Sequence, residues 1–129
     1  MTQTASAWAK NHFAACALDW TPQAASRAAH VLYATVVLGE HEIAQCAAIL
    51  SDEERLRADR QLTEDGRARF VQRRAFRRYC AALATGADTD LSRIRFDETA
   101  TGQPVYTAAP NMTFSFSSCQ LGMMAGWSA

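Results

Sequence analysis

The sequence has no apolar run of the roughly 18 residues that a membrane-spanning helix needs. Its Ala-rich start is interrupted by Lys10, Asn11, His12 and Asp19, so it lacks the continuous apolar segment of a secretory signal peptide. It also contains no internal repeat, no low-complexity segment and no linker. These absences predict a cytoplasmic protein with no membrane partner.

No two cysteines form a CxxC pair, and no histidine lies at metal-ligand spacing from a cysteine. The four cysteines are scattered along the chain: Cys16, Cys46, Cys80 and Cys119. We expect free, partly buried thiols in a reducing compartment. His41-Glu42 resembles half of a zinc motif, but no second histidine follows four residues later, which favours a surface polar pair. The sequence therefore predicts no metal ligands.

Neither charge is in excess, because 13 basic residues balance 13 acidic ones among 129 residues. General nucleic-acid-binding domains usually carry a basic excess, so the composition disfavours a nucleic-acid partner. The length suits one domain with one hydrophobic core, and 49% of the residues are hydrophobic.

The basic residues are concentrated in one segment. Residues 50–83 hold nine of the 13, and twelve consecutive positions without an acid hold six: Arg67, Arg69, Arg73, Arg74, Arg77 and Arg78. On a helix over 67–83, the apolar side chains gather within an arc of about 140° and all six arginines lie outside it. We predict that one face of this helix packs and that the rest binds an anion.

Two alternatives to anion binding remain open for this helix. Its arginines could form a solvated face with salt bridges to Glu53, Glu54, Glu64 and Asp65. They could also contact DNA, although the sequence contains no recognition-helix pattern. For 117–119 (SSC), a nucleophile is an alternative to solvent-facing hydroxyls, but no G-x-S-x-G turn accompanies it.

Local patterns predict the order of the elements. Residues 1–29 read as a short helix or a loosely docked extension, and 30–38 as a strand buried on both sides. A short helix is expected over 40–49. Ser51 and Glu54 form a capping box that starts a helix running to about 62. We expect Gly66 to interrupt the chain before the arginine-rich helix, which ends at Thr85-Gly86.

The last third of the chain predicts strands. A strand is expected to start within 92–97, a turn to form at 101–104, and short strands to follow at 105–106 and 113–118, with 121–127 as a hairpin partner. The fold class expected is α+β, with an antiparallel sheet and helices packed on one face.

Three runs, LSDEERLRADRQLTEDGRARFVQRRAFRR, LSRIRFDETATGQP and MTFSFSSCQLGMMAGWS, carry a resemblance to a known family. In order and spacing they resemble the N-terminal half of surfactin-type 4′-phosphopantetheinyl transferases, with their LS-x-x-E and R-F-V-x-x-R-A helices, I-x-F…G-K-P turn and F-N-x-S-H-S strand. The resemblance covers residues 31–129. It suggests an extension over 1–29 and a half-domain over 30–129 that resembles one half of a pseudo-dimer.

The resemblance implies Mg²⁺-assisted transfer of phosphopantetheine from coenzyme A to a serine of an acyl or peptidyl carrier protein. It places the following residues around coenzyme A: Arg57, Arg69 and Arg74 with the phosphate-binding elements, Gly102, Gln103 and Pro104 beside adenine and ribose, and Ser117 and Ser118 at the 3′-phosphate and pyrophosphate. Guanidinium forks and hydroxyls suit phosphate oxygens. On this basis we predict that Arg69→Ala weakens coenzyme A binding.

The departures from the family pattern are informative. Gln103 replaces the usual Lys of the G-K-P turn, and Ser118 replaces the His of S-H-S. The family's G-[IV]-D-x-E strand and W-x-x-K-E-[AS] helix, which supply metal-binding acids and catalytic groups, are not among these residues. We therefore predict no catalytic residue here, and Mg²⁺ binding only with carboxylates from a partner.

Two functional hypotheses follow from this comparison. The chain is either half of a transferase or a non-catalytic accessory protein that binds a carrier protein or coenzyme A. We further expect a homo- or hetero-oligomer that forms through an open sheet edge at 121–127.

Overall fold

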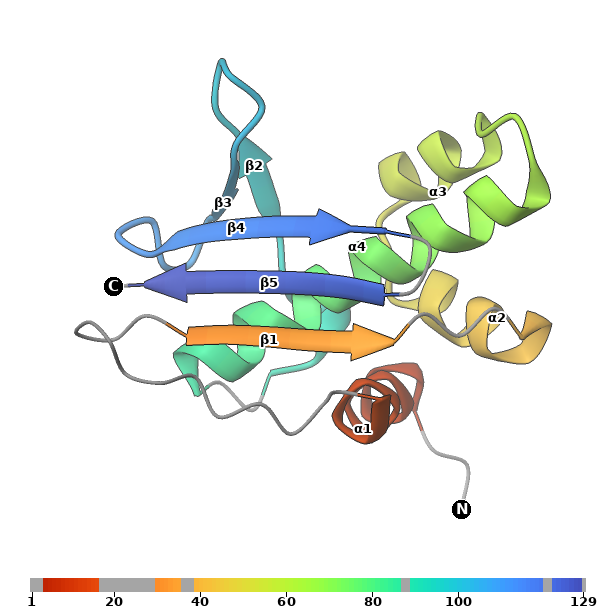
Figure 1. The fold of residues 1–129 in the computed structure, drawn as a ribbon, viewed down its shortest axis with the longest axis horizontal. Helices are drawn as coiled ribbons and strands as arrows, with labels where there is room; N and C mark the ends of the chain where they lie inside the picture. The colour runs from red at the N-terminus through yellow and green to blue at the C-terminus, as the bar shows by residue number, and fades with distance from the viewer. Residues whose placement is uncertain (1–3, 17–29, 36–38, 87–88, 120–121, 129) are drawn as a thin grey trace.

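The computed structural model describes residues 4–16, 30–35, 39–86, 89–119 and 122–128 (Figure 1). It has the predicted α+β class, with antiparallel strands. The elements in chain order are α1 (Ala5–Cys16), β1 (His30–Thr35), α2 (Glu40–Ala48), α3 (Asp52–Asp59), α4 (Glu64–Thr85), the 3₁₀ turn η1 (Leu91–Arg93), β2 (Phe96–Glu98), β3 (Pro104–Tyr106), β4 (Thr113–Ser118) and β5 (Gly122–Ser128).

The strands form two antiparallel sheets. One has the order β1-β5-β4 and the other is the β2-β3 hairpin. The predicted hairpin pairing of β4 with β5 is confirmed. The prediction that this last strand is an exposed edge is wrong, because β1 also pairs with β5 and places it in the centre (Figure 1). Among the described strands, β1 and β4 are the edges of this sheet.

Other strand predictions hold in part. The strand expected over 30–38 is present as β1 as far as Thr35, with Ala34 buried and Tyr33 half-buried, and positions 36–38 lie outside the described residues. Residues 91–93 form η1, which Asp90 caps by accepting from the Ser92 N–H, so the strand expected over 92–97 begins only at Phe96. The turn expected at 101–104 lies slightly earlier, because the Gly102 N–H donates to the Thr99 carbonyl at 2.9 Å and Pro104 already belongs to β3.

Helix α4 is the long central helix of the fold. Its N-cap Thr63 accepts a hydrogen bond from the Gly66 N–H at 2.9 Å, so Gly66 lies in the first turn of α4. The prediction that Gly66 separates the two helices is therefore wrong. The helix ends as predicted, with Gly86 in the left-handed conformation (φ +66°). The preceding helix α3 starts at the predicted capping box but ends at Asp59.

Most sides of α4 are covered. It packs against α1, α2, α3, η1 and β5. The β5 side chains that face the helices, Met123, Ala125 and Trp127, are buried, whereas Met124 on the other face is exposed. The sheet therefore has helices on one face, which matches the prediction.

The N-terminal segment forms a helix, which is one of the two alternatives from the sequence. In α1, Ala9 and Phe13 are fully buried. The Phe13 ring lies 5.5 Å from that of Phe76 and 5.8 Å from that of Tyr79, centroid to centroid. Residues 17–29 lie outside the described part. No described helix is long and apolar enough to cross a membrane.

Candidate functional site: an arginine row on α3 and α4

One of the six clustered arginines has a structural position. Arg78 is only 3% exposed and donates hydrogen bonds to the carbonyls of Leu91 (3.1 Å) and Ile94, while its other terminal nitrogen binds the Glu54 carboxylate. The prediction that all six arginines lie outside the packed face is therefore wrong for Arg78. Small neighbours one turn away, such as Ala75 and Ala82, leave room for its side chain.

Two predicted site residues, Arg57 of α3 and Arg74 of α4, lie together. Their guanidinium carbons are 5.7 and 5.0 Å from the ring centroid of the buried Phe70, within the range of cation–π contacts. Both also approach Oε1 of Glu98 on β2, at 3.8 Å from Arg57 Nη1 and 3.9 Å from Arg74 Nη2. The structure thus brings α3, α4 and the β2-β3 hairpin to one place.

A second pair of arginines lies beside the predicted serines. Arg73 Nη1 donates to Ser118 Oγ at 3.2 Å, and the Arg77 guanidinium lies 5.0 Å from the Phe116 ring centroid. With Ser117, these residues help to line a hollow of about 120 Å³ between α4 and the sheet. Arg73 and Arg77 belong to the six arginines expected to face an anion, but the resemblance did not place them around coenzyme A. Their i, i+4 spacing puts them on one helix face.

We call Arg57, Arg73, Arg74 and Arg77 the arginine row. Burial lowers the pKa of Arg74, and the charge of Arg57 lowers it further, while Glu54 and Glu98 oppose that change. Burial and then the charge of Arg74 lower the pKa of Arg77 to about 10. Within the described part of the chain, Arg77 Nε is buried without a hydrogen-bond partner, as are Arg69 Nε and Arg78 Nε. Arg74 and Arg77 are thus partly desolvated, whereas Arg57 and Arg73 are exposed. The positive charges of the row repel one another, and a bound anion would relieve that repulsion.

The remaining predicted site residues lie elsewhere. Arg69 binds Asp65 within α4 at 3.1 Å, as the salt-bridge alternative anticipated. Gly102 (φ +83°) and Gln103 are exposed in the hairpin turn, and Pro104 opposes Glu98 across the hairpin. The hairpin therefore connects to the arginine row through Glu98.

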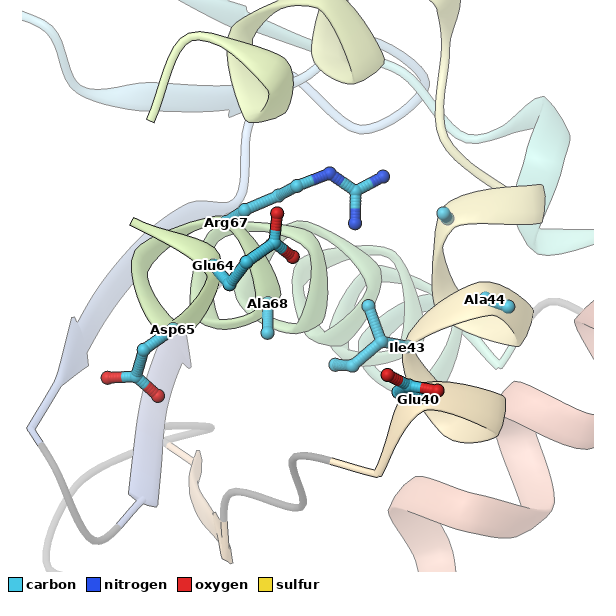
Figure 2. Close-up of a pocket in the computed structure, with 8 residues that line it drawn as sticks. Glu40, Ile43, Ala44, Glu64, Asp65, Arg67 and Ala68 are labelled. Carbon is cyan, nitrogen blue, oxygen red and sulfur yellow. The ribbon is translucent and has the colours of Figure 1, made fainter. Parts of the chain in front are cut away.

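The largest hollow among those described here carries none of the predicted site residues. It measures about 560 Å³ and lies between α2 and the first turns of α4. Figure 2 shows Ile43 of α2 and Ala68 of α4 at this gap, with the acidic side chains Glu40, Glu64 and Asp65 around it. Arg67 also lines the hollow, but three carboxylates against one guanidinium make it a poor place for phosphate.

The predicted free thiols are confirmed for all four cysteines. Among the described residues, no group of three or more His, Cys, Asp or Glu side chains is arranged to hold a metal ion.

A comparison of the chain with family models, with curated proteins and with solved structures finds no match in any of the three.

Proposed function

We propose that this chain is a 4′-phosphopantetheinyl transferase-like protein and that its arginine row binds the phosphates of coenzyme A. The observation that carries the proposal is that two helices bring four arginines together in two pairs. Arg57 and Arg74 approach Glu98, and Arg73 and Arg77 lie beside Ser117 and Ser118. Guanidinium groups are the usual partners of phosphate oxygens because each can donate two parallel hydrogen bonds.

The row has two parts, which suits a ligand with two separate anionic groups. Arg57 and Arg74 meet at Phe70, whereas Arg73 and Arg77 lie with Ser118 and Phe116. Coenzyme A carries a pyrophosphate and a 3′-phosphate on one nucleotide. The Ser118 hydroxyl, which already accepts from Arg73, can donate its own proton to a phosphate oxygen.

The order of elements is consistent with one half of the family's pseudo-dimeric fold, as the resemblance implies. We propose that the carboxylates that hold Mg²⁺, and the groups that act on the carrier-protein serine, come from another chain or segment. A partner that adds a strand to β4 would lie next to Ser118 and the row, because β4 is an edge of the sheet. This revises the expected oligomer contact from β5 to an edge strand.

Calorimetry with coenzyme A tests the binding. We expect Arg74→Gln and Arg77→Gln each to weaken binding by about ten-fold or more, which is the value of a charge-assisted hydrogen bond. Arg93→Gln is the matched control, because Arg93 lies near Asp90 and the start of α1 and not in the row. Wild-type protein that binds no coenzyme A at low salt with Mg²⁺ present would overturn the proposal.

Mass spectrometry of an apo carrier protein tests whether this chain transfers phosphopantetheine on its own. The carrier protein is incubated with coenzyme A, Mg²⁺ and this chain. A gain of the phosphopantetheine mass identifies a transferase. Binding of coenzyme A without that gain identifies an accessory protein or a half that needs its partner.

A further inference from the structure

We propose that Glu98 is a built-in counter-anion of the arginine row and that it selects ligands by their charge. An incoming anion must take the place of the Glu98 carboxylate. This inference rests on the proposed function only in its choice of ligand, because the competition itself requires no more than an anion-binding row.

The position of Glu98 supports this role. It is the last residue of β2, and its Oε1 lies 3.8 Å from Arg57 Nη1 and 3.9 Å from Arg74 Nη2, so one oxygen serves guanidinium groups of two helices. Its charge also acts on Arg77, whose pKa it raises against the larger effects of burial and Arg74. The carboxylate thus contacts two members of the row and acts on a third through its charge.

The contacts are those of a replaceable ion. Both distances exceed the roughly 2.7–3.2 Å of an N–H···O hydrogen bond, so the carboxylate neutralises charge without good hydrogen bonds. The Glu98 side chain is 47% exposed, so its carboxylate can return to water when it is displaced. When the Glu98 carboxylate is displaced, the row loses one neutralising negative charge but few good hydrogen bonds.

Selectivity follows from this exchange. A monovalent carboxylate that displaces Glu98 replaces one charge with one charge and gains little. A phosphate ester or pyrophosphate brings more negative charge and several acceptor oxygens, which the forks of Arg57 and Arg74 can bind bidentately. Glu98 therefore favours multiply charged phosphates over monovalent anions.

The chain offers a matched control one residue away. Asp97 is also exposed and acidic, but successive side chains of a strand point to opposite faces, so it leaves β2 on the other side from Glu98. Glu98→Gln and Asp97→Asn remove the same charge from the same strand. A general change in the field of the protein affects both variants, whereas a direct competition affects only the first.

The test measures binding of coenzyme A and of inorganic pyrophosphate to wild type, Glu98→Gln and Asp97→Asn by calorimetry. We expect Glu98→Gln to bind both about five-fold more tightly, the effect of one ion pair at a partly exposed site, and Asp97→Asn to bind within about two-fold of wild type. Acetate, compared with chloride at equal ionic strength, should weaken pyrophosphate binding to Glu98→Gln and leave wild type unchanged.

The outcomes separate the two proposals. Coenzyme A binding that is equal in wild type and Glu98→Gln, or equally tightened by Asp97→Asn, overturns the role of Glu98 and leaves the ligand assignment intact. Pyrophosphate binding that Glu98→Gln tightens, without any coenzyme A binding, supports the role of Glu98 and overturns the ligand assignment. No binding of either anion to any variant overturns both.

Discussion

The carboxylate of Glu54 and the guanidinium of Arg78 join helices α3 and α4, which carry the arginine row. Glu54 accepts from the Ser51 backbone N–H at 3.0 Å, which completes the capping box of α3, and the same oxygen binds Arg78 of α4. Burial alone raises the pKa of Glu54, but the hydrogen bonds from Ser51 and the charge of Arg78 outweigh it and lower that pKa. Glu54 therefore both caps its own helix and holds α3 against α4.

Arg78→Met should lower the free energy of unfolding by about 3–5 kcal/mol, because it leaves the Glu54 carboxylate and the carbonyls of Leu91 and Ile94 without their buried partner. Urea denaturation followed by circular dichroism measures this change. Arg93→Met, at an exposed arginine, should stay within about 0.5 kcal/mol of wild type. An Arg78→Met protein as stable as wild type would show that the pair does not hold α3 against α4.

Acid should weaken the attachment of α1 through Asp90. The hydrogen bond from the Ser6 hydroxyl, and then those from Ser92, lower the pKa of Asp90 from 3.8 to about 2. A carboxylate whose pKa is lowered by folding stabilises the fold above its unfolded pKa, and this stabilisation is lost as the pH falls toward the folded value. It is thus lost between pH 3.8 and about 2.

Asp90→Asn isolates this contribution. The stability difference between wild type and Asp90→Asn should be constant at neutral pH and shrink as the pH falls below 3.8. Glu54 adds acid sensitivity of the same sign to both proteins, so the difference removes its effect. A difference that does not change between pH 7 and pH 2 would contradict the prediction.

Phe13→Ala should destabilise the protein by about 3–5 kcal/mol, as for other buried aromatic residues. Its ring is fully buried between α1 and α4, near Phe76 and Tyr79. Leu62→Ala is the control, because Leu62 is fully exposed and should change stability by less than about 0.5 kcal/mol. Equal thermal midpoints for the two variants would mean that α1 is not part of the folded core.

Arg69 and Arg77 should differ in their effect on the ligand. Arg69 already binds Asp65, whereas the Arg77 guanidinium lies over the Phe116 ring at the hollow beside Ser117. We expect Arg69→Gln to change coenzyme A affinity by less than about two-fold and Arg77→Gln to reduce it about ten-fold or more. Titration of both variants at the same salt concentration measures this. A larger loss of affinity for Arg69→Gln than for Arg77→Gln would favour the coenzyme A site implied by the sequence resemblance, which includes Arg69.

Features set by neighbours in the chain could be predicted. The capping box at Ser51 and Glu54 and the end of α4 at Gly86 depend on residues a few positions apart, and both were found where expected. Gly66 was misjudged because glycine is a poor helix former, while the Thr63 hydroxyl that caps its N–H was not considered.

Features set by distant segments could not be predicted in the same way. The central place of β5 comes from its pairing with β1, a strand that begins 97 residues before its partner Trp127. A helical projection of 67–83 shows which positions are apolar, but it does not show that Arg78 can reach Glu54 and the carbonyls of the 91–94 segment. For the same reason the projection gave no sign that Glu98 of β2 would lie between Arg57 and Arg74.

The stacking of Arg57 and Arg74 on Phe70 has a consequence for the entropy of ligand binding. A free arginine side chain loses about 2 kcal/mol of rotamer entropy when it is fixed, and much of that loss occurs on binding at an ordinary surface site. Here the aromatic ring and the α4 packing restrict both guanidinium groups before any ligand arrives. An anion would then meet donors that are already oriented, and its affinity would depend on charge and shape more than on ordering the side chains.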